Sequence, residues 1–174
     1  RGKVKRTGRS KCGRITVRRR GGGHKKRYRF IDFKRGNFDI PGVIKSIEYD
    51  PNHSSFIVLV CYKDGEKRYI LAPRGIKVGE EIISSQKNIG RKIGSRLLLK
   101  YVPLGLSVYN IELNPGRGGK IARSAGSYAI LQSKENGFAQ LKMPSGEIRI
   151  VPEACMASIG QVSNIEHEAE RFGK

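Results

Sequence analysis

The sequence has no tryptophan, three histidines and three cysteines among its 174 residues. Cys12, Cys61 and Cys155 are odd in number and none is paired at Cys-x-x-Cys spacing, so we expect no disulfide framework and a reducing compartment. The histidines stand far from one another and from any cysteine cluster, which argues against a zinc site.

Long apolar runs and catalytic constellations are also lacking. No apolar segment approaches the roughly 20 residues of a membrane-spanning helix, and the basic N-terminal region has no amphipathic stripe, so no membrane partner is predicted. No Ser–His–Asp set or pair of acids can be argued, so the sequence does not predict an enzyme. A glycine-rich loop nearly resembles a nucleotide P-loop, but Asn114 and Ile121 stand where that motif needs glycine and Ser or Thr.

Positive charge is abundant and unevenly distributed along the chain. Thirty-five Lys and Arg face 15 Asp and Glu, which gives a formal net charge of +20 and an isoelectric point near 10.3. Residues 1–35 hold 16 of the basic residues and one acid, so their net charge is +15, against +5 for the remainder. Such a segment repels itself, and the asymmetry is typical of an arm that binds nucleic acid.

The centre of this arm, residues 14–35, combines cations with glycines and aromatic rings. Three consecutive glycines, residues 21–23, allow a close approach of the backbone to phosphate strands. Tyr28, Phe30 and Phe33 stand among the cations, and flat rings beside guanidinium groups suit unpaired bases and sugars. A second basic, glycine-rich loop spans residues 116–126, where free backbone N–H groups are expected to cradle phosphate.

The rest of the chain predicts an all-β fold, because short strand-like runs alternate with turn signals. Asp64-Gly65 and Asn136-Gly137 are hairpin signals. Strands are expected over residues 43–49, 56–62, 67–71, 78–83, 96–101, 107–113, 128–133, 138–143, 147–151 and 158–162. We expect an extended basic arm over residues 1–37, one barrel over 38–105 and a second over 106–174. The second barrel is expected to end in a short helix over 165–172, capped by Asn164.

Several long motifs together resemble the universal large-subunit ribosomal protein two family, in its bacterial and organellar form. They lie at residues 13–18, 21–25, 28–29, 31–35, 47–52, 64–75, 109–113, 115–119 and 122–126. The resemblance covers nearly the whole chain. It implies an OB-like barrel followed by an SH3-like barrel, primary binding to large-subunit rRNA, and neighbouring ribosomal proteins as partners. It also implies support for subunit association, tRNA placement and the peptidyl-transferase region, without enzymatic activity of the chain.

Two departures from the family pattern stand out. The family usually carries Arg after Asp-Pro-Asn, at a position linked to rRNA binding. Here that residue is His53, so we expect a weaker or pH-dependent contact, while the partner position keeps Arg123. The family also continues into a long basic C-terminal arm, which does not follow Lys174 in this sequence. Either a separate polypeptide carries that arm, or the sequence stops before it. We expect an organellar ribosome, mitochondrial rather than plastid, with the bacterial cytoplasm as the alternative.

These considerations give a set of candidate RNA-binding residues. In the arm they are Arg14, Arg18, Arg19, Arg20, Gly21, Gly22, Gly23, His24, Lys25, Lys26, Arg27, Tyr28, Arg29, Lys34 and Arg35. In the barrels they are His53, Arg68, Arg74, Arg117, Lys120, Arg123 and Ser124. No cofactor is expected, and magnesium ions only through bound rRNA. The alternatives are a ribosome-associated enzyme or nuclease, and a free RNA-binding regulator or chaperone.

Overall fold

The computed structural model describes residues 8–21, 23–90, 92–170 and 173. Its strands form two antiparallel sheets, which confirms the predicted all-β fold class. The first sheet has the order β3-β2-β1-β4 and contains β1 (Gly42–Glu48), β2 (Ile57–Tyr62), β3 (Lys67–Leu71) and β4 (Glu81–Ile82). The second has the order β5-β10-β6-β7-β8-β9 and contains β5 (Arg96–Leu98), β6 (Ser107–Tyr109), β7 (Ala129–Glu135), β8 (Phe138–Lys142), β9 (Ile148–Pro152) and β10 (Met156–Ile159).

The hairpins form where the turn residues predict them. The β2–β3 turn places Gly65 at φ 86°, and Gly65 N donates to Tyr62 O at 3.0 Å. The β7–β8 turn places Asn136 at φ 50° and Gly137 at φ 79°, as a two-residue turn with two left-handed positions requires. Each sheet curls around its own apolar core, with β2 contributing Val58 and Val60 to the first and β7 contributing Leu131 to the second.

The boundary between the two sheets lies earlier in the chain than the sequence analysis places it. β5 pairs with β10 through Arg96–Ser158 and Leu97–Ala157, so it belongs to the second sheet. The turn after the 3-10 helix η1 (Leu99–Tyr101) is internal to the second barrel, because Gly105 N donates to Leu131 O at 2.7 Å. The expected division at 105/106 is therefore too late along the chain.

The expected C-terminal helix is also shorter than predicted. A 3-10 helix, η2, covers Ile165–Glu168, and part of the predicted range lies outside the described residues. Asn164 does not cap it, since this residue has φ 61° and its side-chain amide donates to Ser54 O of the first barrel at 2.7 Å. The other described residues contain no helix long and apolar enough to cross a bilayer.

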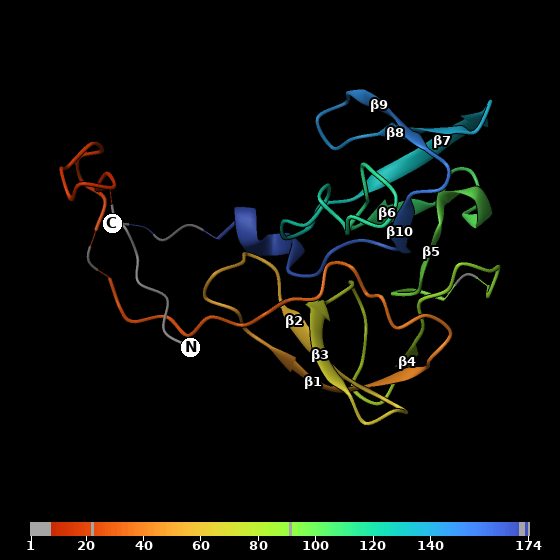
Figure 1. Cartoon of the computed structure of the whole chain (residues 1–174), viewed down its shortest axis with the longest axis horizontal. Coiled ribbons are helices and arrows are strands. Elements are labelled where there is room, and N and C mark those ends of the chain that lie inside the picture. The colour runs from red at the N-terminus through yellow and green to blue at the C-terminus, as the bar shows by residue number, and fades with distance from the viewer. Residues whose placement is uncertain (1–7, 22, 91, 171–172, 174) are drawn as a thin grey trace.

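The basic arm projects from the junction of the two barrels, as the red and orange trace in Figure 1 shows. At that junction the barrels share backbone hydrogen bonds, from Ser163 N to Ala72 O at 3.0 Å and from Arg74 N to Gln161 O at 2.7 Å. A small apolar cluster of Leu71, Tyr109 and Val162 fills the space beneath them. The barrels and the base of the arm therefore meet at one place.

Candidate nucleic-acid interface

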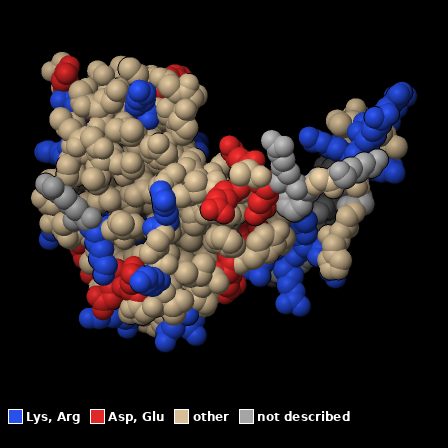
Figure 2. Space-filling view, turned by 180° about the vertical axis from the view of Figure 1, so that it is seen from behind, with Lys and Arg blue, Asp and Glu red and all other residues tan. Residues whose placement is uncertain are grey.

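The described cations of the projecting arm are exposed and have no carboxylate partner within the described parts of the chain. They are Arg9, Lys11, Arg14, Arg18, Arg19, Arg20, Lys25, Lys26 and Arg27. Figure 2 shows Lys and Arg side chains crowding the projecting arm, while much of the neighbouring barrel surface carries neither charge. Uncompensated cations at this density attract a polyanion.

Within the arm, the expected glycine turn is only partly described. Gly21 and Gly23 are exposed, and Gly23 has φ 81° with open space around it. Gly22 lies outside the described residues. His24 is exposed, and its Nδ1 lies 2.9 Å from the backbone oxygen of Lys25. The described residues therefore leave the space beside Gly23 open.

The arm runs back to the first barrel through residues 26–27. Lys26 Nζ donates to Pro51 O at 3.1 Å, and Asn52 Nδ2 donates to Arg27 O at 3.0 Å. These contacts bring the arm beside the turn that carries His53. The basic surface of the arm is therefore continuous with that turn.

The base of the arm lies against β3. Ile31 forms a parallel bridge with Tyr69, and Asp32 N donates to Tyr69 O at 2.7 Å. Arg68 of β3 pairs with Asp32 at 2.7 Å and with Glu66 at 2.8 Å. Hydrogen bonds to Glu66 and then to Asp32 raise the pKa of Arg68. The guanidinium of Arg68 is therefore already paired with two carboxylates of the chain. Arg29, another candidate, is half-buried and lies 3.6 Å from Glu48.

Arg35 is the clearest correction to the candidate residues. It is 2% exposed, and its Nη1 donates to Gly94 O at 2.6 Å and to Ser158 Oγ at 3.3 Å. Its guanidinium therefore links the arm to the second barrel and is inaccessible to phosphate. The neighbouring Lys34 is exposed, so its ammonium group remains accessible to phosphate.

The glycine-rich loop, like Arg35, uses its expected phosphate-binding groups for contacts within the chain. The sequence predicts free N–H groups at residues 116–126, but Glu112 accepts from Gly118 N at 2.9 Å and from Gly116 N at 3.2 Å. Gly119 N donates to Phe33 O at 3.1 Å, and a Cβ on Gly119 would overlap the side chain of Asn110. A buried carboxylate of the chain itself occupies the cradle that we expected for phosphate. The loop keeps Arg117 and Lys120 exposed.

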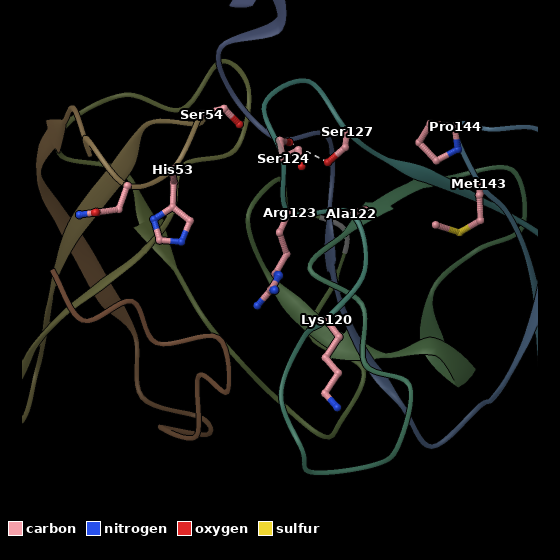
Figure 3. A pocket seen from close by; sticks show the side chains of 10 residues that line it. His53, Ser54, Lys120, Ala122, Arg123, Ser124, Ser127, Met143 and Pro144 are labelled. Carbon is pink, nitrogen blue, oxygen red and sulfur yellow. Dashed lines mark hydrogen bonds between the residues drawn. The ribbon is translucent and has the colours of Figure 1, made fainter. Parts of the chain in front are cut away.

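A cavity of about 450 Å³ opens between the two barrels and gathers candidates from both. Lys120, Arg123 and Ser124 line it from the second barrel, and His53 with Asn52 from the first. Figure 3 shows His53 facing the loop that carries Arg123 and Lys120, whose side chains extend in the same direction. Carboxylates are absent among its described lining residues. The cavity therefore presents cations and hydroxyl groups suited to an anion.

The Phe33 ring lies against two residues of this cavity, Arg123 and His53. The guanidinium carbon of Arg123 lies 4.4 Å from the centroid of the Phe33 ring, and the His53 ring lies 6.1 Å from it at a 59° tilt. Phe33 comes from the arm, His53 from the first barrel and Arg123 from the second. A cation over an aromatic face is held without a carboxylate, so its charge stays available to a ligand.

His53 is bonded to Asp50, which is fully buried. Burial raises the pKa of Asp50, but the hydrogen bonds from His53 and Asn52 outweigh it and lower the pKa below its ordinary value of 3.8. Asp50 is thus an ionised acceptor that orients the imidazole toward the cavity.

Two positioning features were missed by the sequence analysis. Ser54 Oγ accepts from Ala125 N at 3.1 Å, and this bond ties the His53 turn to the Arg123 loop. Arg96 and Glu112 form a buried ion pair at 2.8 Å. Burial, with the like charge of Arg35 added, lowers the pKa of Arg96 to about 10, although Glu112 opposes the shift. No local pattern marks either feature, because the partners come from separate strands and loops.

Arg74, the remaining candidate, lies outside the cavity. It is exposed, and its Nη1 donates to Gln161 Oε1 at 3.3 Å across the junction. Groups of three or more His, Cys, Asp or Glu residues that could hold a metal ion are absent from the described residues.

Two β-barrels joined to an extended basic arm define a class of all-β proteins with a long cationic surface. Comparisons with known proteins identify the family of the chain. Residues 1–84 match the family model described as "Ribosomal Proteins L2, RNA binding N-terminal domain", and residues 92–174 match "Ribosomal Proteins L2, C-terminal domain". The chain belongs to the ribosomal protein L2 family, and the two matches also separate the barrels before β5.

A relative supports the same family. The chain is 55% identical over 167 residues to "Large ribosomal subunit protein uL2" of Akkermansia muciniphila. The match covers 96% of this chain and 60% of the relative, so the chain spans less than two thirds of that protein's length.

Proposed function

We propose that this chain is a structural, non-enzymatic component of the large ribosomal subunit and a primary binder of its rRNA. The observation that carries the proposal is the convergence of three elements around Phe33. Arg123 from one barrel and His53 from the other lie over or beside this ring, and the arm that supplies it brings exposed cations to the same surface. Such a surface binds backbone phosphates and fixes how the protein sits on folded RNA.

Salt-dependent binding to a large-subunit rRNA transcript tests the proposal. Each lost phosphate contact lowers the slope of log affinity against log salt by about 0.7–0.9. We expect Arg123→Ala to weaken binding by about 1–3 kcal/mol and to lower the slope by one such step. Arg149→Ala is the matched control, because Arg149 pairs with Glu147 at 3.2 Å on the far edge of the second sheet. Equal effects of the two variants would contradict the proposed interface.

The roles that the family implies in subunit association, tRNA placement and support of the peptidyl-transferase region form a further part of the proposal. They follow from the resemblance, and the site supports them only through RNA binding. We also propose that magnesium enters solely with the rRNA. Subunit reassociation with particles carrying Arg123→Ala or wild-type protein tests the first of these roles directly.

We propose that this ribosome is organellar, mitochondrial rather than plastid. The relative is bacterial, so the similarity supports a ribosomal location without distinguishing the compartment. Peptide mapping of large subunits purified from isolated mitochondria tests this proposal. The absence of peptides of this chain from those subunits would contradict it.

A further inference from the structure

A second cavity of about 440 Å³ lies where the base of the arm crosses β3. Its lining includes Tyr28, Phe30 and Asp32 from the arm and Arg68 and Tyr69 from β3. The parallel bridge between Ile31 and Tyr69 fixes the two walls relative to each other. The cavity is thus built from the arm and the first barrel together.

The charges around this cavity are largely neutralised by the chain. Arg68 pairs with both Asp32 and Glu66, and Arg29 lies 3.6 Å from Glu48. Asp32 Oδ1 also accepts from Lys34 N and Arg35 N. The cavity around Arg123 differs in this respect, since it has no carboxylate among its described lining residues. The Phe30 cavity is therefore poorly suited to phosphate, with Lys67 as its one lining cation outside these ion pairs among the described residues.

Its aromatic character is strong by contrast. Phe30 is 74% exposed, the largest exposed fraction among the large apolar residues that the structure describes. Its ring meets Tyr28 edge-on, with centroids 5.1 Å apart and planes at 88°. This edge-to-face packing holds the Phe30 ring in place and leaves it open to solvent. Phe33, which the sequence places in the same group, is instead packed beneath Arg123.

We propose that the exposed Phe30 ring is a stacking platform for an unpaired nucleobase of the bound RNA. The inference rests on the proposed RNA binding and assigns a base to this cavity, whereas the Arg123 cavity takes phosphate. Bases of single-stranded loops stack on aromatic side chains in this way. Because Asp32 and Arg68 are already engaged, the platform accepts any base by stacking and does not read its edge.

The absence of tryptophan makes a direct test available. Phe30→Trp introduces the only indole of the chain at the proposed platform, and Phe138→Trp introduces it at a matched position, because Phe138 on β8 is 50% exposed. The probes are a mixed-sequence single-stranded RNA oligonucleotide and an abasic oligonucleotide with the same number of phosphates. We expect the first probe to quench the fluorescence of Phe30→Trp and the abasic probe to leave it unchanged. Phe138→Trp should respond to neither.

Affinity gives a second measurement. Phe30→Ala should weaken binding of the base-carrying probe by about 5–150-fold, as loss of one stacked base does, and leave the affinity of the abasic probe and the salt slope unchanged. Equal losses on both probes, or no loss on either, would overturn the platform while wild-type binding upheld the proposed function. Failure of the wild-type chain to bind either probe would overturn both.

Discussion

The projecting arm and the junction between the barrels use the same residue type in opposite ways. Arg18, Arg19 and Arg20 are exposed in the arm. Arg35 and Arg96 are 2% and 0% exposed at the junction, where Arg35 donates to Gly94 O and Arg96 pairs with Glu112. An arginine of this chain is available to an external anion only where its charge is uncompensated, since a guanidinium with internal partners contributes to the fold instead.

The glycines of the two regions differ in the same respect: one is open to an external partner and the other packs against the chain itself. Gly23 of the arm has open space around it, whereas Gly119 is pressed against Asn110 and donates its N–H to Phe33 O. The first is suited to close approach by an external strand, and the second allows the chain to pack on itself.

Removing the charge of Glu112 should break the junction most severely. Glu112→Gln leaves Arg96 buried without a counter-charge, and weakens the acceptor for Gly116, Gly118 and Met156 N. We expect the free energy of unfolding to fall by about 3–5 kcal/mol. Denaturant unfolding measures the change, with Glu147→Gln as the control, because its exposed pair with Arg149 contributes about 1 kcal/mol or less. A loss no larger than that of the control would contradict the structural role of Glu112.

Paired substitutions in the two regions sharpen the comparison. Arg35→Ala leaves Gly94 O buried without its donor and should lower the free energy of unfolding by about 1–3 kcal/mol. Arg18→Ala should leave stability unchanged and lower the salt slope of RNA binding by about 0.7–0.9. Urea unfolding and filter binding of both variants separate the two effects. The comparison fails if Arg35→Ala alters the slope at unchanged stability.

Asp50 makes a smaller, pH-dependent contribution to the free energy of unfolding. The pKa of Asp50 is lowered in the folded state, so its hydrogen bonds stabilise the fold above about pH 3.8, its ordinary pKa. This stabilisation is lost as the pH falls through the lower pKa of the folded state. We expect Asp50→Asn to cost on the order of 1 kcal/mol near neutral pH and to reduce the acid sensitivity of unfolding. Unfolding curves at several pH values measure this difference, and a parallel pH dependence of the two proteins would contradict it.

Local patterns were sufficient for much of the fold. The β-branched run of β2 and the Asp64-Gly65 and Asn136-Gly137 turns carry their own structural information, since turn chemistry and strand propensity act between neighbouring residues. The exposed cations of the arm were predictable for the same reason, because their charge density has no local compensation.

The remaining features depend on partners that are remote in the sequence. Arg35 meets Gly94 across 59 residues, and no local signal distinguishes it from Lys34. Glu112 is buried beneath the glycine-rich loop together with Arg96 of β5, its ion-pair partner. The short sequence of β5 does not reveal which sheet this strand joins. The Arg123 cavity likewise requires the barrels to dock, so sequence could nominate its residues individually but could not bring them together.

His53 offers the finest test of how a compensated group differs from a free one. Its imidazole bonds to buried Asp50 on one side and faces the cavity of Arg123 and Lys120 on the other. His53→Arg places a guanidinium at this position, and a guanidinium binds a phosphate through two parallel N–H donors. We therefore expect His53→Arg to raise RNA affinity by less than about tenfold, or 1.4 kcal/mol. Titrations of an rRNA transcript at fixed salt and fixed pH measure the difference, with Arg149→Ala as the control for general charge effects. If wild-type and His53→Arg proteins bound the transcript equally well, this position would make no phosphate contact, and His53 would belong with the structural groups of the junction.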